Sequence, residues 1–125
     1  MKTAELTGVS MNLKNELAQF YGTEHYYKHM FGGMVYTDGV KYFAENAGGG
    51  AYWLLDIIAT EVMQLHKTQP FISIHLISYG HKAKLKVDDG NDHKLWSKII
   101  HLTDCPEGDW QFYLIDKVLM LTSEY

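Results

Sequence analysis

The sequence contains no arginine, and all eleven of its basic residues are lysines. Arginine makes most bidentate contacts with phosphate groups and guanine bases, so its absence argues against direct nucleic-acid recognition. The formal net charge of −4 is too small to suggest mimicry of DNA. Nucleic acid is therefore not among the expected partners.

Cysteine is scarce as well, since Cys105 is the only one. A single cysteine excludes an internal disulfide bond and any zinc site built from several cysteines. No basic residue stands next to Cys105 in the sequence, so we expect an inert thiol.

Long apolar runs are also missing. The longest dense run, residues 51–58, is interrupted by Asp56 and is far shorter than the roughly 20 residues that a membrane span requires. Residues 1–10 carry one lysine but neither an apolar core nor a small-residue cleavage site, so no secretory signal is predicted. These absences predict a cytoplasmic protein without a membrane partner.

What is present fits one globular domain. The chain has 125 residues, of which 46% are hydrophobic and 21% are charged. Residues 1–11 are polar and aperiodic, which predicts a loose extension before a single domain over residues 12–125. Asn12 can cap a short helix that ends near Gly22, because Leu13 and Leu17 lie on one face of it.

The main helix is predicted over residues 51–67. Asp56, Thr60 and Gln64 recur every four residues, while apolar side chains fill the opposite side. One long helix with this pattern can cover one face of a sheet.

Three hairpins are predicted. Asp38-Gly39 between two β-prone runs is a strong hairpin signal and places the first hairpin over residues 34–45. The others span residues 83–102 and 110–121, and residues 71–79 form a further strand. Short links between successive strands predict an α+β fold with an antiparallel sheet of about five to seven strands.

No motif predicts catalysis, a metal or a cofactor. His25 and His29 have helical spacing, but glutamate does not follow the first histidine as it does in catalytic zinc sites. The acidic loop 88–92 lacks the alternating ligands of a calcium loop, and glycines 48–50 lack the lysine of a phosphate-binding loop. No serine lies in a nucleophile motif.

Aromatic side chains exceed what one helix-covered sheet needs to bury, and exposed Tyr and Trp are favoured in contact surfaces. The candidate binding residues are Tyr36, Asp38, Tyr42, Trp53, Asp56, Trp96 and Trp110. The sequence is also compatible with a homo-oligomer.

The end of the chain predicts a structural clasp. Residues 118–121 have strand character, and a terminal strand is easily stripped from a sheet unless it is anchored. Tyr125 offers a ring to bury, and Glu124 offers a negative charge to lysines or to helix N-terminal amides. We therefore expect residues 123–125 to be ordered.

Three stretches, residues 36–42 (Tyr-Thr-Asp-Gly-Val-Lys-Tyr), 50–56 (Gly-Ala-Tyr-Trp-Leu-Leu-Asp) and 118–125 with its final Ser-Glu-Tyr, occur in a familiar order and spacing. Together they resemble an uncharacterised domain-of-unknown-function family of short bacterial proteins carried by plasmids, integrative elements and phages. The resemblance covers roughly residues 13–125. Thr122 stands where the family has proline, and the glycine run 48–50 is longer than the family's.

The resemblance implies no activity, but it implies a mobile-element setting in which small proteins often bind host machinery. The leading hypothesis is a non-catalytic module that binds a host or mobile-element protein, for example to inhibit a defence or regulatory protein. The alternative is a small-molecule-binding or enzymatic domain. Its pocket would lie between the first hairpin and the main helix and use Tyr36, Tyr42, Trp53 and Asp56.

Overall fold

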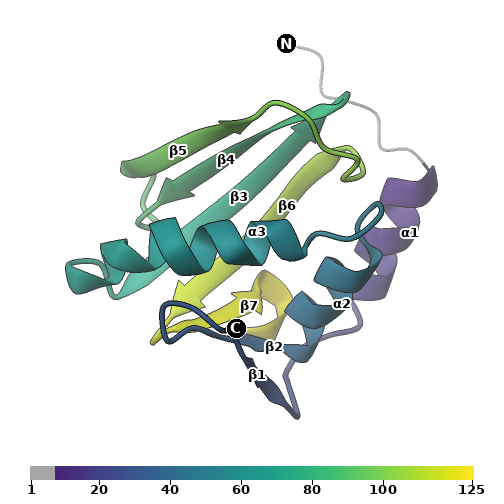
Figure 1. Cartoon of the computed structure of the whole chain (residues 1–125). Helices are drawn as coiled ribbons and strands as arrows, with labels where there is room; N and C mark the ends of the chain where they lie inside the picture. Colours follow the sequence, from purple (N-terminus) through teal and green to yellow (C-terminus); the bar gives the residue numbers. More distant parts are fainter. Residues whose placement is uncertain (1–7) are drawn as a thin grey trace.

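The computed structural model describes residues 8–125 and has two layers, a seven-stranded sheet and the helices that cover one of its faces (Figure 1). The helices are α1 (Gly8–Leu17), α2 (Asp38–Asn46) and α3 (Tyr52–Ile57), which continues as a π-helical turn (Ile58–Val62) and a 3-10 turn (Met63–Lys67). The strands are β1 (Tyr26–Lys28), β2 (Val35–Thr37), β3 (Phe71–Tyr79), β4 (Lys82–Asp88), β5 (Lys94–Ile100), β6 (Gly108–Ile115) and β7 (Val118–Leu121), followed by a 3-10 turn (Thr122–Glu124).

The strand order is β1-β2-β7-β6-β3-β4-β5, so β5 and β1 form the two edges. The predicted strand 71–79 is confirmed as β3, and the hairpins 83–102 and 110–121 are confirmed as β4–β5 and β6–β7. All neighbours are antiparallel except β2 and β7, which pair in parallel. The sheet is thus mixed but mostly antiparallel, because a long connection between β2 and β7 permits the parallel pair.

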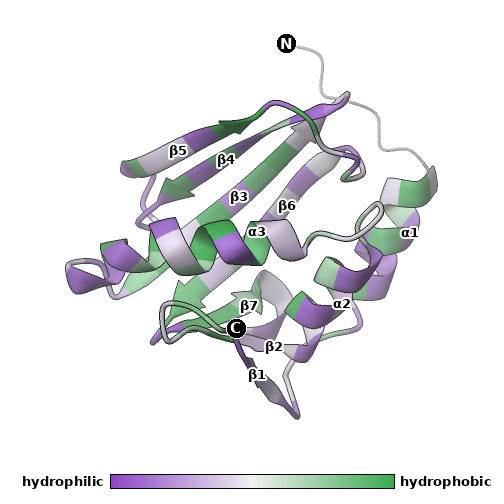
Figure 2. Cartoon of the chain, in the orientation of Figure 1, coloured by the Kyte–Doolittle hydropathy of each residue, from purple (hydrophilic) through white to green (hydrophobic). Residues whose placement is uncertain are grey.

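The core lies between the sheet and the helices. Strand β3 alternates, with Ile72, Ile74 and Leu76 fully buried beneath the helices, while Ile77 on the other face is 38% exposed. Figure 2 shows hydrophobic and hydrophilic residues following one another along α3, and its hydrophobic residues Leu54 and Leu55 are fully buried. Period-two burial in the strands and one apolar helix stripe explain the two layers.

The main helix confirms the prediction for residues 51–67, although its middle is not α-helical. Leu54, Leu55, Ile58 and Val62 are fully buried. Thr60 lies within the π-helical turn, and its hydroxyl donates to the carbonyl of Asp56 at 2.7 Å. A serine or threonine that bonds back to the preceding turn competes with the backbone and loosens the α-helical pattern.

The predicted hairpin over residues 34–45 is wrong. Residues 35–37 are strand β2, but Asp38 and Gly39 begin helix α2, and Gly39 does not have the positive φ that the hairpin turn requires. The Thr37 hydroxyl accepts from the amide of Val40 at 3.3 Å and caps the helix. Val40, Phe43 and Ala44 have helical spacing and are fully buried.

The C-terminus forms the expected contacts through Glu124. Its carboxylate accepts from the Thr37 hydroxyl at 2.6 Å, the Gly39 amide at 3.2 Å and the Leu121 amide at 2.9 Å. The Tyr125 ring, by contrast, is not buried: the residue is 78% exposed and contacts the ring edges of neighbouring aromatic residues. We call the contact of Glu124 with Thr37 and Gly39 the C-terminal clasp.

The N-terminal helix begins at Gly8, before the predicted cap at Asn12, and ends at Leu17. Residues 1–7 of the predicted extension lie outside the described residues, while residues 8–11 belong to α1. Leu13 and Leu17 face the core as expected. Among residues 8–125, no helix is long and apolar enough to cross a membrane.

Candidate functional site

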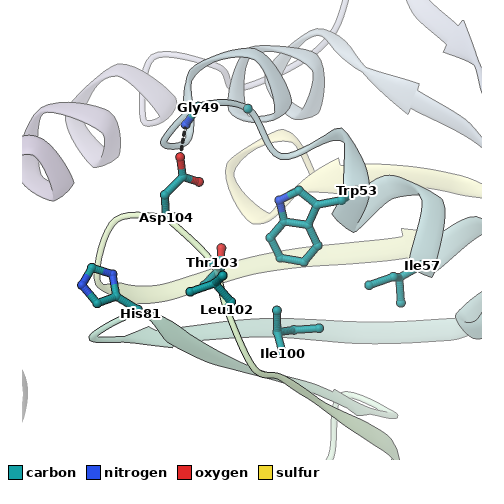
Figure 3. A pocket seen from close by; sticks show the side chains of 9 residues that line it. Gly49, Trp53, Ile57, His81, Ile100, Leu102, Thr103 and Asp104 are labelled. Carbon is teal, nitrogen blue, oxygen red and sulfur yellow. Dashed lines mark hydrogen bonds between the residues drawn. The ribbon is translucent and has the colours of Figure 1, made fainter.

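An open groove of about 670 Å³ lies between the start of α3 and the segment that follows β5 (Figure 3). Trp53 and Ile57 point into it from successive turns of α3, and Ile100 and Leu102 form the opposite wall. Leu102 is 81% exposed, a high value for a leucine beside other apolar side chains. The complete lining is Gly49, Gly50, Trp53, Ile57, His81, Ile100, Leu102, Thr103 and Asp104.

The polar end of the groove is held by hydrogen bonds. The Asp104 carboxylate accepts from the amide of Gly49 at 2.7 Å, which ties the segment after β5 to the loop before α3. The Thr103 amide donates to the carbonyl of His81 at 2.8 Å, and the Thr103 hydroxyl accepts from the Cys105 amide at 3.1 Å. The groove is therefore preformed, and its carboxylate is already engaged.

Of the candidate binding residues, Trp53 alone lines the groove. Trp110 is 2% exposed, its indole donates to the Pro106 carbonyl at 2.7 Å, and its ring packs against Phe43. Trp96 is half-buried on β5 and packs against the core from the helix side of the sheet. Two of the three tryptophans thus stabilise the fold.

The remaining candidates lie apart from the groove. The Tyr36 ring packs on the ring of Tyr27 with centroids 5.6 Å apart. The Tyr42 hydroxyl donates to the carboxylate of Glu16, and the Asp56 carboxylate bonds His29 at 2.8 Å. The structure therefore does not gather Tyr36, Tyr42, Trp53 and Asp56 around one pocket.

Asp38 organises the loop before β1. Desolvation alone would raise the pKa of its carboxyl group, but hydrogen bonds from the Tyr27 hydroxyl at 2.8 Å and from the amides of Glu24 and His25 lower the pKa to about 2. The position at the first turn of α2 suits a negative charge. Asp38 therefore has a structural role, joining residues 23–27 to α2.

Asp38→Asn should lower the melting temperature, and the difference from the wild type should depend on pH. Because the folded-state pKa is about 2 against an ordinary value of 3.8, ionised Asp38 stabilises the fold above pH 3.8, and this contribution disappears as the pH falls toward 2. Thermal unfolding of both proteins across this range measures the effect.

Asp92→Asn, at an exposed loop position, is the matched control and should leave the melting temperature unchanged. A difference between Asp38→Asn and wild type that is as large near pH 2 as at neutral pH would contradict the role of the charge.

A second cluster, on the sheet face opposite the helices, has the residue types of a nucleophilic triad. His75 lies 3.4 Å from the Ser73 hydroxyl and 3.0 Å from the Asp109 carboxylate. Ser73 is only 3% exposed, and β3 is paired on both sides, which commits its amides to the sheet. A nucleophile needs access and free oxyanion donors, so we assign this cluster no catalytic role.

Neither the histidines nor the cysteine form a reactive site. His25 and His29 flank strand β1 and contact different aspartates, Asp38 and Asp56. Within residues 8–125, no three His, Cys, Asp or Glu side chains gather so as to hold a metal ion. Burial raises the pKa of the Cys105 thiol to about 12, which keeps the thiol protonated and unreactive.

Sequence reasoning missed most of the groove. Trp53 was a candidate, but the exposure of Leu102 and the approach of His81 depend on tertiary structure. One available signal was missed on the other face: Ser73 and His75 are two apart on a strand and so share a side of the sheet.

No curated protein and no solved structure matches the chain. A family model does match, over residues 11–125, and this range includes the groove, the C-terminal clasp and all seven strands. The chain belongs to the family of unknown function DUF6876.

Proposed function

We propose that the chain is a non-catalytic protein-binding module of a mobile genetic element and that the groove is its contact surface. The main support is Leu102, which is 81% exposed and lies across the groove from the half-buried Trp53. Exposed apolar side chains that adjoin an aromatic residue are typical of protein interfaces. The proposed partner is a host defence or regulatory protein, and this setting rests on the resemblance of residues 36–42, 50–56 and 118–125.

A protein suits the groove better than a small molecule. Small-molecule pockets enclose most of the ligand and add a few convergent polar groups. This groove is open, its long wall is apolar, and the Asp104 carboxylate already accepts from Gly49. An apolar protrusion of a partner would fill the space between Trp53, Ile57 and Leu102.

Affinity purification from host lysate tests this proposal. Tagged wild-type protein should retain a stoichiometric partner, and Leu102→Asp should lose it because the substitution places a charge in the apolar wall. Once the partner is identified, Trp53→Ala should weaken binding by about 30-fold, the effect of losing an interface anchor worth about 2 kcal/mol.

Met30→Asp is the matched control, since Met30 is 84% exposed and lies outside the groove lining. This variant should bind as the wild type does. Retention of the partner by Leu102→Asp, or the absence of any partner in repeated purifications, would contradict the proposal.

A further inference from the structure

Strand β4 carries three lysines on the sheet face opposite the helices, the face turned away from the viewer in Figure 1. Lys82, Lys84 and Lys86 alternate with buried apolar residues, so their side chains share this face. Successive lysines are about 7 Å apart along the strand, because an extended chain rises by about 3.4 Å per residue. We call these three residues the lysine row.

The fold itself gives no reason for the lysine row. Lysine is depleted in strands, and the lysines that protect a sheet lie on its edges, whereas β4 lies between β3 and β5. In the part of the chain that the structure describes, the lysines in ion pairs are Lys41 and Lys98, and none belongs to the row. Three uncompensated positive charges thus stand together on a protein whose net charge is −4.

Exposed apolar and aromatic side chains flank the row. Lys84 lies directly between Ile77 of β3 and Ile99 of β5, which are 38% and 52% exposed. Lys82 lies across from Tyr79, which is 68% exposed. A partner that covered these side chains would exclude water from the ammonium groups and so strengthen their attraction to negative charge.

We propose that the lysine row binds an extended acidic segment of a protein, which lies along β4 and carries Asp or Glu at alternate positions. Alternate side chains of an extended chain point to the same side and recur about every 7 Å, which is also the spacing of the lysines. Each ammonium group can therefore meet one carboxylate. Charge complementarity of this kind selects the partner and fixes its register on the strand.

A narrow segment fits this face better than a membrane does. Asp109 lies on the same face, on β6 two strands away, and its carboxylate is held 3.0 Å from His75. Because neighbouring strands are about 4.8 Å apart, an anionic bilayer on the lysine row would meet this negative charge about 10 Å to the side. A segment that follows β4 avoids it. The absence of arginine argues against a nucleic acid in the same place.

The acidic segment goes beyond the proposed function, because the lysine row and the groove lie on opposite faces of the sheet. Ile100 lines the groove and pairs with Ala83, a buried residue of β4 that faces the helices. The neighbouring residue Lys84 faces the other way. Variants of the row thus report on the acidic segment separately from Leu102→Asp in the groove.

Titration of the isotope-labelled protein with a synthetic peptide of alternating glutamate and threonine tests the proposal through the amide chemical shifts. At low salt the amides of residues 75–79, 82–86 and 97–99 should shift and saturate, while those of Trp53 and Leu102 should not. Lys84→Glu should weaken binding by about tenfold, because the central attraction becomes a repulsion. Salt at about 1 M, where the Debye length is about 3 Å, should abolish binding.

Lys67→Glu is the matched control, since it makes the same change of charge at an exposed lysine of the 3-10 turn that ends the main helix, and it should bind as the wild type does. Lys82→Glu, at the exposed end of the row, is a second variant and should also weaken binding, and the amide spectra show that each variant is folded. A peptide that shifts no amide of β4 overturns the proposal. So does wild-type binding by both row variants, or an equal loss in Lys67→Glu. Tighter binding to vesicles of phosphatidylserine and phosphatidylcholine, or to single-stranded oligothymidylate, than to the peptide would overturn it as well.

Discussion

Glu124→Ala should lower the free energy of unfolding by about 3 kcal/mol, the value of a charged acceptor shared by several hydrogen bonds. The carboxylate accepts from Thr37, Gly39 and Leu121 and so joins the start of α2 to the end of β7. Its removal leaves these donors without that acceptor. In a domain of this size the melting temperature should fall by about 10 °C.

Thermal and denaturant unfolding of three variants tests the clasp. Glu124→Gln should lose part of the stability, because the amide keeps one acceptor but loses the charge. Glu45→Ala is the control, since that side chain is 48% exposed and its ion pair with Lys41 is 3.8 Å long. Removal of residues 123–125 should destabilise at least as much as Glu124→Ala. A truncated protein that melts unchanged but loses a partner would instead make this segment a recognition tail.

Gly32→Ala is expected to have the other large effect. A Cβ atom at Gly32 would lie 2.3 Å from the carbonyl oxygen of Ala59, which is backbone of the π-helical turn. Gly32 also has a φ of 72°, which strains an L-residue by about 1–2 kcal/mol. The collision adds about 1–3 kcal/mol, because a helix carbonyl cannot rotate away as a side chain can.

Gly33→Ala separates the strain of the positive φ from the collision with the Ala59 carbonyl. Gly33 has nearly the same φ, 69°, but its added Cβ would meet nothing within 4 Å. Denaturant unfolding should therefore show a loss of about 1–2 kcal/mol for Gly33→Ala from strain alone and a clearly larger loss for Gly32→Ala. Equal losses would show that the loop moves away from the helix and that the contact with Ala59 does not fix it.

Local patterns predicted the fold where a segment's own residues determine its structure. Residues 71–79 alternate between buried and exposed positions, and the loop 88–92 supplies turn residues between two strands. The prediction of a hairpin over residues 34–45 was wrong because Asp38-Gly39 suits both a tight turn and the start of a helix. In the structure the first turn of α2 is held by a hydrogen bond from the Gly39 amide to the Glu124 carboxylate, which lies 85 residues away in the sequence.

The candidate site was harder to predict than the fold. Tryptophan and tyrosine are common both in cores and in interfaces, and composition cannot tell buried Trp110 from groove-lining Trp53. Leu102 became a candidate only through its exposure, which depends on how the segment after β5 is held by His81 and Gly49. Contacts between segments that are distant in the sequence produce no periodic pattern of residues, so the sequence alone does not predict them.

The parallel pairing of β2 with β7 sets an order of assembly. The segment 71–115 contains β3, β4, β5 and β6, which are neighbours in the sheet and can associate as soon as they are synthesised. Strands β1 and β2 are made before them, yet they join the sheet only through β7, the last strand in the sequence. Strands β1 and β2 can therefore join the sheet only after β7 is in place. The pairing of β2 with β7 is a non-local contact, and such contacts form slowly during folding. Until it forms, the free edges of β2 and β6 are the surfaces on which misfolding and chaperone capture would act.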